Sequence, residues 1–257
     1  MTKITKFTVQ DVRFPTSKDL TGSDAIHTDP DYSATYVTAF TDDSELKGYG
    51  IAFTIGKGND IVAECIKHFF PIFENMDLDD LENNIGKLWF KCVDHSQLRW
   101  LGPEKGVVHM AVSAIFNCLW DLISKKHKKP LWQFIAESEP EKILSWLTFK
   151  YIEDVLTPEE ALAILTRNQK EKKQRIETIL QEGYPSYTTA AGWLGYSDDK
   201  IIQLCKDYMA KGWRHFKIKV GLDLEADVKR LELIRKTIGD DCFIMVDANQ
   251  QWNVEQS

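Results

Sequence analysis

The stretches HFKIKV (residues 215–220) and IMVDANQ (residues 244–250) decide the fold of this chain. Each is a short apolar run of the kind that forms a buried strand, and each carries charged residues that such a strand normally excludes. Side chains alternate between the two faces of a strand, so Lys217 and Lys219 point to the same face. Asp247 ends the second run. Charges at the ends of apolar strands are costly unless they hold a ligand, so this pattern predicts a functional site.

Simpler interpretations exist for each residue taken alone. A single lysine near a strand end is usually a solvated edge residue, and an aspartate after a strand often caps a following helix. Here, however, Lys217 and Lys219 occur together, and Asp247 follows about thirty residues later, which is the spacing of a β-α-β unit. Asn249 returns to the face of Asp247. We interpret the four side chains as one site, and the helix-cap role of Asp247 is compatible with it.

The chain around these strands alternates between strand and helix patterns. The expected elements are strands over 186–190, 215–220 and 243–247, and helices over 197–211 and 223–238. Short connections in such an alternation indicate parallel strands with helical crossovers. An open doubly wound sheet and a closed (β/α)₈ barrel both fit. The sequence lacks the G-x-G-x-x-G fingerprint of dinucleotide-binding sheets, and polar residues at strand carboxyl ends favour the barrel.

The first half of the chain has a pattern typical of an α+β domain. Residues 1 to about 55 are expected to form a β-meander, with a bulge at Gln10–Asp11. A polar loop over 16–32 is long for an ordinary connection, which is typical of a functional lid. The further elements are expected to be helices over 60–70, 81–93 and 106–124, a short helix from Pro130, a strand over 142–149 and one long helix over 157–182. We therefore predict an α+β capping domain over residues 1–138 and the first part of a (β/α)₈-type barrel over 139–257.

The composition is that of a folded intracellular protein. With 257 residues, 43% of them hydrophobic, and eight tryptophans, the chain can bury a large core. The net charge of −7 is spread along the chain, which speaks against a nucleic-acid partner. The five cysteines are widely spaced without C-x-x-C, which indicates reduced thiols. No apolar run approaches a membrane span of about 18 residues, and the N-terminus has no signal-peptide core, so we expect no membrane partner and a mitochondrial or cytoplasmic location.

The residues at the strand ends suit one kind of chemistry. A carboxylate with an amide nearby suits Mg²⁺, although one carboxylate cannot hold it tightly and partners must come from further strands. Paired lysines suit proton abstraction, because a second ammonium group disfavours the charged form of the first. Together they suggest removal of a proton alpha to a carboxylate, with the enediolate charge stabilised by metal and lysine. The enolase superfamily is a known example of a Lys or His base working with Mg²⁺.

Several blocks of the sequence resemble that superfamily. The segments KIK (217–219) and VDAN (246–249) are similar to the K-x-K and first metal-ligand motifs of its mandelate-racemase branch. More closely, four blocks resemble L-fuconate dehydratases: GSDAIHTDPDYSATYV from residue 22, QLRWLGPEKGVVHMA from residue 97, YIEDVLT from residue 151 and WLGYSDD from residue 193. The resemblance runs along the whole chain. It implies an N-terminal capping domain and a C-terminal barrel, which is the layout expected above.

The resemblance also implies roles for individual residues. Lys219 would be the general base and acid at the alpha carbon, Lys217 would contact the substrate carboxylate, and Asp247 would be the first Mg²⁺ ligand. The remaining implied substrate-binding residues are Gly22, Ser23, Asp24, Tyr32 and Asn249. The implied reaction removes the C2 proton of L-fuconate and expels the 3-hydroxyl as water, giving 2-keto-3-deoxy-L-fuconate. For the loop, a plain solvated turn is the alternative, since Asp and Gly are common in turns.

The chain departs from the family pattern in its length. The family's two further acidic ligands, and the His that protonates the departing hydroxyl, would lie beyond Ser257. We therefore expect a polypeptide of these residues alone neither to bind Mg²⁺ at micromolar affinity nor to turn over L-fuconate. Two alternatives are another acid-sugar dehydration or racemization within the superfamily, and a non-catalytic binding or assembly module. Full-length members of the family commonly assemble into homo-oligomers.

Overall fold

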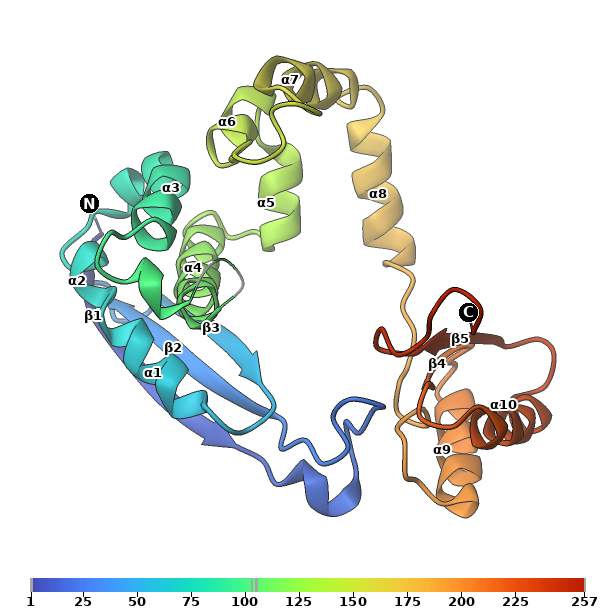
Figure 1. Cartoon of the computed structure of the whole chain (residues 1–257). Helices are drawn as coiled ribbons and strands as arrows, with labels where there is room; N and C mark the ends of the chain where they lie inside the picture. Colours follow the sequence, from blue (N-terminus) through green and yellow to red (C-terminus); the bar gives the residue numbers. More distant parts are fainter. Residues whose placement is uncertain (1, 103, 105, 257) are drawn as a thin grey trace. The chain divides into compact units, whose positions relative to one another are not determined.

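The computed structural model describes residues 2–102, 104 and 106–256, which form two compact units (Figure 1). The first unit comprises the residues up to Val12 together with Ser33–Gly183. The second comprises Arg13–Tyr32 together with the residues from Tyr184 on. The domain boundary expected at residue 138 stays a prediction, and residues 139–183 pack with the first unit.

The first unit is built on a three-stranded sheet in the order β1-β2-β3. Its strands are β1 (Ile4–Arg13), β2 (Ser33–Thr41) and β3 (Lys47–Thr54). β1 is one continuous strand across Gln10–Asp11. β2 and β3 pair antiparallel, and side chains such as Val37 and Ala52 are buried on the face that carries the helices. Alternation along β3 leaves the opposite face to solvent, as expected for an antiparallel sheet with one covered face.

Helices cover one face of this sheet and complete the core of the first unit (Figure 1). They are α1 (Asn59–Lys67), α2 (Phe70–Phe73), α3 (Leu78–Val93) and α4 (Val107–Lys126), with a 3₁₀ turn, η2 (Arg99–Leu101). α4 crosses β3 where the strand carries Gly48 and Gly50. A Cβ atom on Gly50 would lie 2.1 Å from the carbonyl oxygen of Ala114. Glycine is therefore required for this close approach of helix and strand.

α4 corrects the expectation that no apolar segment of the chain approaches the length of a membrane span. It is 20 residues long and contains an 18-residue window with a mean hydropathy of 1.5, so by length and composition it is long and apolar enough to cross a membrane. Its side chains are instead largely buried against β2, β3, α1 and α3 in the core of the first unit. A helix that is apolar nearly all round is also what a buried core position requires.

The strand expected over 142–149 is wrong. After α5 (Leu131–Glu137) the chain forms a short helix, α6 (Pro140–Ser145). Proline is favoured in the first turn of a helix, where its missing N–H is not needed. Trp146 then packs edge-on against Trp120, with ring centroids 5.0 Å apart. An apolar run this short does not distinguish strand from helix by its pattern alone.

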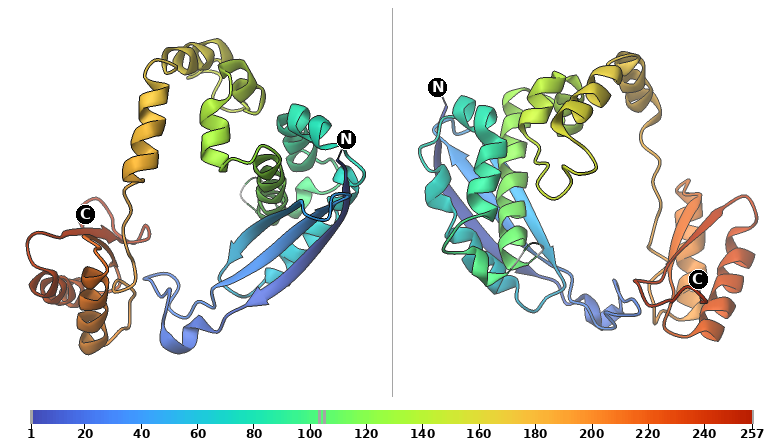
Figure 2. Two further views of the ribbon diagram at one scale, coloured as in Figure 1. Left: turned by 180° about the vertical axis from the view of Figure 1, so that it is seen from behind. Right: turned by 45° about the horizontal axis from the view of Figure 1, so that its top comes forward.

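The single long helix expected over 157–182 is in fact two helices, α7 (Pro158–Arg167) and α8 (Lys172–Glu182) (Figure 2). The expected start is correct, and Thr157 and Glu160 form a complete capping box. The break comes before α8, where Glu171 has a left-handed φ of 58°. Arg175 donates hydrogen bonds to the carbonyl oxygens of Asn168 and Lys170 in this break.

The second unit contains parallel strands covered by helices. β4 (His215–Lys219) and β5 (Phe243–Asp247) pair in parallel, and α9 (Asp198–Ala210) and α10 (Leu224–Ile238) pack together beside them (Figure 2). These elements confirm the expected alternation. The strand expected over 186–190 is reduced to one parallel bridge between Thr188 and Phe216. The fold expected from the sequence, a capping domain with an antiparallel sheet followed by the first β/α units of a barrel, is confirmed.

We expect Gly50→Ala to lower the free energy of unfolding of the first unit by about 3 kcal/mol, because the added methyl group overlaps the α4 backbone. Urea denaturation followed by far-UV circular dichroism measures this change. Ile51→Ala is the matched control, since Ile51 is 43% exposed on the same strand. Its expected cost is about 1 kcal/mol or less. An equal loss of unfolding free energy in the two variants would contradict the close approach of β3 and α4.

Candidate active site

The parallel pairing of β4 with β5 brings the predicted charged residues together. Lys219 lies opposite Asp247 in the register, and Lys217 precedes it by two residues on the same face. The Nζ atom of Lys219 lies 2.9 Å from Oδ2 of Asp247, and the Nζ atom of Lys217 lies 3.2 Å from the same oxygen. Lys219 is only 8% exposed. Two ammonium groups therefore share one carboxylate oxygen at the carboxyl ends of the strands.

Asn249 completes this cluster through the turn that follows β5. Its side-chain oxygen accepts a hydrogen bond of 2.8 Å from Nζ of Lys219, and its backbone N–H donates to Oδ1 of Asp247 over 3.1 Å. Asn249 and Gln250 both have left-handed backbones, with φ of 50° and 57°. Asn tolerates this region better than most residues, and such conformations concentrate at functional sites. The turn directs the amide back toward the lysines.

The charges of the cluster shift one another's pKa values. The hydrogen bond from Lys219 is the largest cause that lowers the pKa of Asp247, to about 2. For Lys217, partial burial lowers the pKa, but hydrogen bonds to Tyr187 and Asp247 outweigh it, so the pKa is raised. The expectation that a neighbouring ammonium group lowers the pKa is therefore wrong for Lys217. The hydrogen bond with Tyr187 and the carboxylate of Asp247 reverse the direction.

Aromatic side chains that the sequence analysis did not select line the lysine pair. The Lys217 ammonium lies 4.8 Å from the ring centroid of Tyr187, and that of Lys219 lies 6.0 Å from the ring of Trp193. Tyr32 packs edge-on against Trp193, with ring centroids 5.9 Å apart. Tyr187 lies within the expected strand over 186–190 and Trp193 follows it, and that position was the available signal. Cation–π contacts of this kind add to the electrostatic anchoring of the lysines.

The predicted loop residues lie close to this cluster, within the same unit. Gly22, Ser23 and Asp24 are buried, and the Tyr32 hydroxyl donates to the carbonyl oxygen of Gly22 over 3.2 Å. Burial is the largest cause that raises the pKa of Tyr32. The backbone N–H of Leu194, next to Trp193, donates to the Ser23 carbonyl oxygen over 3.0 Å. The loop is thus joined to the segment that carries one of the aromatic residues.

The side chains of Ser23 and Asp24 form hydrogen bonds within the loop itself. Ser23 donates to the carbonyl oxygen of Thr28 over 3.0 Å. Oδ1 of Asp24 accepts hydrogen bonds from the backbone N–H groups of Ile26 and His27 at 2.9 and 2.7 Å. Burial acts to raise the pKa of Asp24, but these two bonds and the His27 ring outweigh it, so the pKa lies below its ordinary value. Asp24 therefore orders the loop, and its role toward a substrate stays a prediction.

The fit of a divalent metal to these residues is partial. Asp247 supplies one hard oxygen ligand, and its Oδ2 atom already accepts from both lysines. Among residues 2–102, 104 and 106–256 there is no group of three or more His, Cys, Asp or Glu side chains that could hold a metal ion. A cation and the ammonium groups would compete for the same oxygen. One carboxylate does not make a tight magnesium site.

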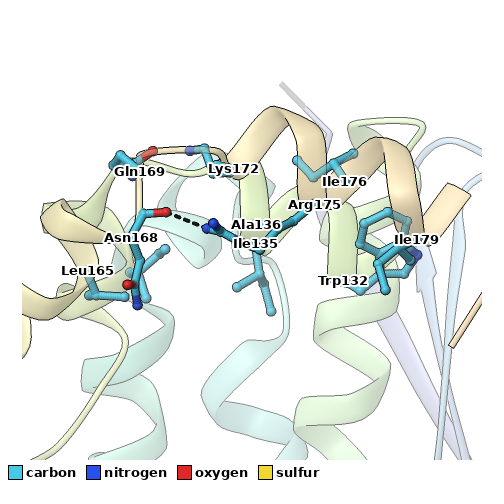
Figure 3. Close-up of a pocket in the computed structure, with 11 residues that line it drawn as sticks. Trp132, Ile135, Ala136, Leu165, Asn168, Gln169, Lys172, Arg175, Ile176 and Ile179 are labelled. Atoms are coloured by element: carbon cyan, nitrogen blue, oxygen red, sulfur yellow. Dashed lines mark hydrogen bonds between the residues drawn. The ribbon is translucent and has the colours of Figure 1, made fainter. Parts of the chain in front are cut away.

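A separate hollow of about 330 Å³ lies in the first unit, between α5, α7 and α8 (Figure 3). Figure 3 shows Trp132, Ile135, Ile176 and Ile179 on its walls, with Arg175 turned toward Asn168. The lining is largely apolar and brings together no acid and base. The ends of β4 and β5 are therefore the better candidate for a chemical site.

Comparisons with known proteins agree with this geometry. The sequence pattern of a family described as "Enolase C-terminal domain-like" matches residues 200–257. The L-galactonate dehydratase of Hypocrea jecorina is 48% identical over 257 residues, which cover 99% of this chain and 57% of that protein. The crystal structure of human mitochondrial enolase superfamily member 1 matches with a TM-score of 0.93 at 46% identity, covering 98% of this chain and 58% of that chain.

A more distant structure shares the fold. L-talarate/galactarate dehydratase from Salmonella typhimurium LT2, liganded with Mg and L-lyxarohydroxamate, matches with a TM-score of 0.65 at 20% identity, covering 99% of this chain and 54% of that chain. An antiparallel capping sheet, parallel β/α units and a lysine pair facing a carboxylate define one class of fold and site. The chain belongs to the enolase superfamily. It spans about 58% of the length of the curated relatives it matches.

We expect Asp24→Asn to reduce the hydrogen-exchange protection of the Ile26 and His27 amides about tenfold at neutral pH, since both bonds lose a charged acceptor. The folded pKa of Asp24 is lowered, so its stabilisation is complete above the unfolded pKa of about 4 and is lost as the pH falls through the folded pKa. The difference between wild type and variant should therefore be constant from about pH 5 to 8 and should close below about pH 4.

Asp29→Asn provides the control for this measurement, because Asp29 is exposed in the same loop. It should leave both amides as protected as in the wild type. Unchanged protection in Asp24→Asn at neutral pH would show that the carboxylate does not order the loop.

Proposed function

We propose that this chain is part of an acid-sugar dehydratase, a hydro-lyase that removes water from a sugar acid after abstracting the proton alpha to its carboxylate. The observation that carries the proposal is the cluster in which Lys217, Lys219 and Asn249 surround Asp247 at the carboxyl ends of parallel strands. Relatives named as dehydratases support the reaction class. The chain spans only part of their length, so the activity proposed is that of a protein containing it.

We propose L-fuconate as the substrate, with 2-keto-3-deoxy-L-fuconate as the product. L-fuconate is 6-deoxy-L-galactonate, so it shares its carboxylate, C2 and C3 with the substrate that the name of the Hypocrea jecorina relative gives for that protein. The two acids differ only at C6, away from the reacting atoms. The name of this relative therefore supports the same reacting half of the substrate.

The residues of the chain have distinct roles in this proposal. Lys219, buried at the strand end, takes the proton from C2. Lys217, whose raised pKa keeps it cationic, pairs with the substrate carboxylate. The hydroxyl at C3 then gains a proton from a general acid and leaves as water as the C3–O bond breaks, and the resulting enol takes up a proton at C3 as it becomes the 2-keto-3-deoxy acid.

The remaining assignments concern the metal and the loop. Asp247 would be one ligand of Mg²⁺, with further ligands outside the described residues, and the bound ion would stabilise the enediolate charge. Asn249 and Tyr32 would contact the substrate beside the lysines. Gly22, Ser23 and Asp24 would shape the loop next to it. The partner is thus a small sugar acid.

We also propose a mitochondrial or cytoplasmic location. Relatives are named mitochondrial enolase superfamily members. The five cysteines are all free and buried, which suits a reducing compartment. Self-association of the full-length protein stays a prediction.

In a protein that contains this chain and spans the length of its relatives, Lys219→Ala should lower kcat for L-fuconate about 1,000-fold or more, because it removes the base. Lys217→Ala should chiefly raise KM, because it removes a carboxylate partner. Formation of the 2-keto-3-deoxy acid measures turnover, and exchange of the C2 proton in D₂O measures abstraction separately. An exchange rate that Lys219→Ala leaves unchanged would contradict the role of Lys219.

A polypeptide of residues 1–257 should bind Mg²⁺ with a Kd of about 1 mM or weaker, because one carboxylate is too few for a tight site. Isothermal titration calorimetry with MgCl₂ tests this, with Asp247→Asn as the matched variant. A micromolar Kd that Asp247→Asn abolishes would show that the ligand set is sufficient. Turnover of L-fuconate by this polypeptide would contradict the requirement for further ligands.

A further inference from the structure

A buried ion pair on α10 lies outside the set of residues assigned above. Asp227 is 3% exposed, and its Oδ1 atom lies 3.2 Å from a guanidinium nitrogen of Arg230, whose side chain is 11% exposed. Both residues face the strands from the first half of α10. A charged pair at such a position requires an account, because charges are rarely buried without a specific arrangement of partners.

Both residues of the pair form hydrogen bonds with backbone groups close to Lys219. Arg230 donates to the carbonyl oxygen of Lys219, and it also donates to those of Gly192 and Trp193 over 3.4 and 3.3 Å. Oδ2 of Asp227 accepts from the backbone N–H of Gly221 over 2.7 Å. One ion pair thus connects the end of β4 with the segment that carries the aromatic residue beside Lys219.

The backbone of Lys219 is consequently held at both of its polar groups. Its N–H donates to the carbonyl oxygen of Gly192 over 2.8 Å, while its own carbonyl oxygen accepts from Arg230. The contact with residue 192 requires glycine, because a Cβ atom there would lie 2.1 Å from the carbonyl oxygen of Lys217. The next residue along the chain, Val220, donates to the Asp247 carbonyl oxygen over 3.0 Å.

Stability alone does not explain this pair. Burial is the largest influence on the pKa of Arg230 and lowers it, although Asp227 opposes the shift. Replacing a buried ion pair with apolar residues is often neutral or stabilising, so such a pair is weak evidence for a gain in stability. Its distinct property is geometry, because the planar guanidinium presents several donors in a fixed fork. Here that fork meets three carbonyl oxygens that belong to two segments.

We propose that Arg230, oriented by Asp227, is a positioning residue that fixes the backbone of Lys219 and thereby sets the place of its ammonium group between Asp247 and Trp193. The role of Lys219 as a base rests on the proposed function, but its placement by Arg230 does not. Loss of the guanidinium frees the Lys219 carbonyl and the Gly192–Trp193 segment together. The Lys219 side chain then leaves its buried position more often.

Site-resolved acetylation of the 257-residue chain with acetic anhydride tests this placement. Arg230→Ala should raise the acetylation rate of Lys219 about fivefold or more, since each hydrogen bond lost to a buried carbonyl changes a local equilibrium by about that factor. Asp227→Asn should raise it less, because Arg230 keeps its carbonyl partners. The exposed Lys206 on α9 should be acetylated at the wild-type rate in every variant.

Two controls separate positioning from general destabilisation. Arg235→Ala removes another arginine of α10, which donates to the carbonyl oxygens of Gly239 and Cys242 at the other end of the helix. It should leave the Lys219 rate unchanged. Alkylation of the buried Cys205 and Cys242 reports unfolding of the second unit, and both thiols should stay protected in Arg230→Ala.

An unchanged Lys219 rate in Arg230→Ala would overturn the proposal. So would a rise that Arg235→Ala matches, or one that appears only together with alkylation of Cys205 and Cys242. Should Arg230→Ala not fold, Asp227→Asn decides, and a Lys219 rate equal to wild type in that variant would also overturn it. Dehydration does not enter these measurements, so failure of the proposed function would leave their outcome standing.

Discussion

The parallel pairing of β4 with β5 is the constraint on which the site depends. Strand alternation sends Lys217 and Lys219 to one face, and the register places Lys219 opposite Asp247. A shift of one residue along either strand would send these charges to opposite faces. The hydrogen bonds to the Asp247 oxygens, the return of Asn249 and the aromatic contacts all require this register. The chemistry of the site is therefore a property of backbone pairing before it is one of side chains.

Much of the fold could be predicted because strong local patterns agree with the tertiary structure. α9 and α10 lie within a residue or two of their expected limits, and both begin after residues that cap them, Ser197 and Asp223. The predictions that failed concern segments whose structure is not specified by local patterns. The apolar run after Pro140 was too short to distinguish helix from strand. The break before α8 depends on Arg175 reaching carbonyl groups several residues earlier, which no hydrophobic periodicity reveals.

The candidate site, too, could be predicted only in part. Residues on the two strands could be placed together because β-α-β units obey fixed geometry, and the structure brings Lys217, Lys219, Asp247 and Asn249 within hydrogen-bonding distance. Tyr187, Trp193 and Arg230 could not be selected in this way. Their contacts with the lysines depend on how a connecting segment and a helix pack, and amphipathic patterns do not specify which residues meet. The raised pKa of Lys217 likewise depends on the positions of Tyr187 and Asp247.

The division of the chain into units has a topological consequence. The loop between β1 and β2 packs with the second unit, although β2 and all of β1 except Arg13 belong to the first. The polypeptide therefore passes from one unit to the other at Val12–Arg13, Tyr32–Ser33 and Gly183–Tyr184. One cut by a protease or one gene breakpoint cannot detach either unit intact. Recombination that replaced only the part of the second unit after Gly183 would leave behind the loop Arg13–Tyr32, which evolved to pack against the segment that was lost. Because the chain passes back and forth between the two units, evolution cannot exchange one of them without affecting the other.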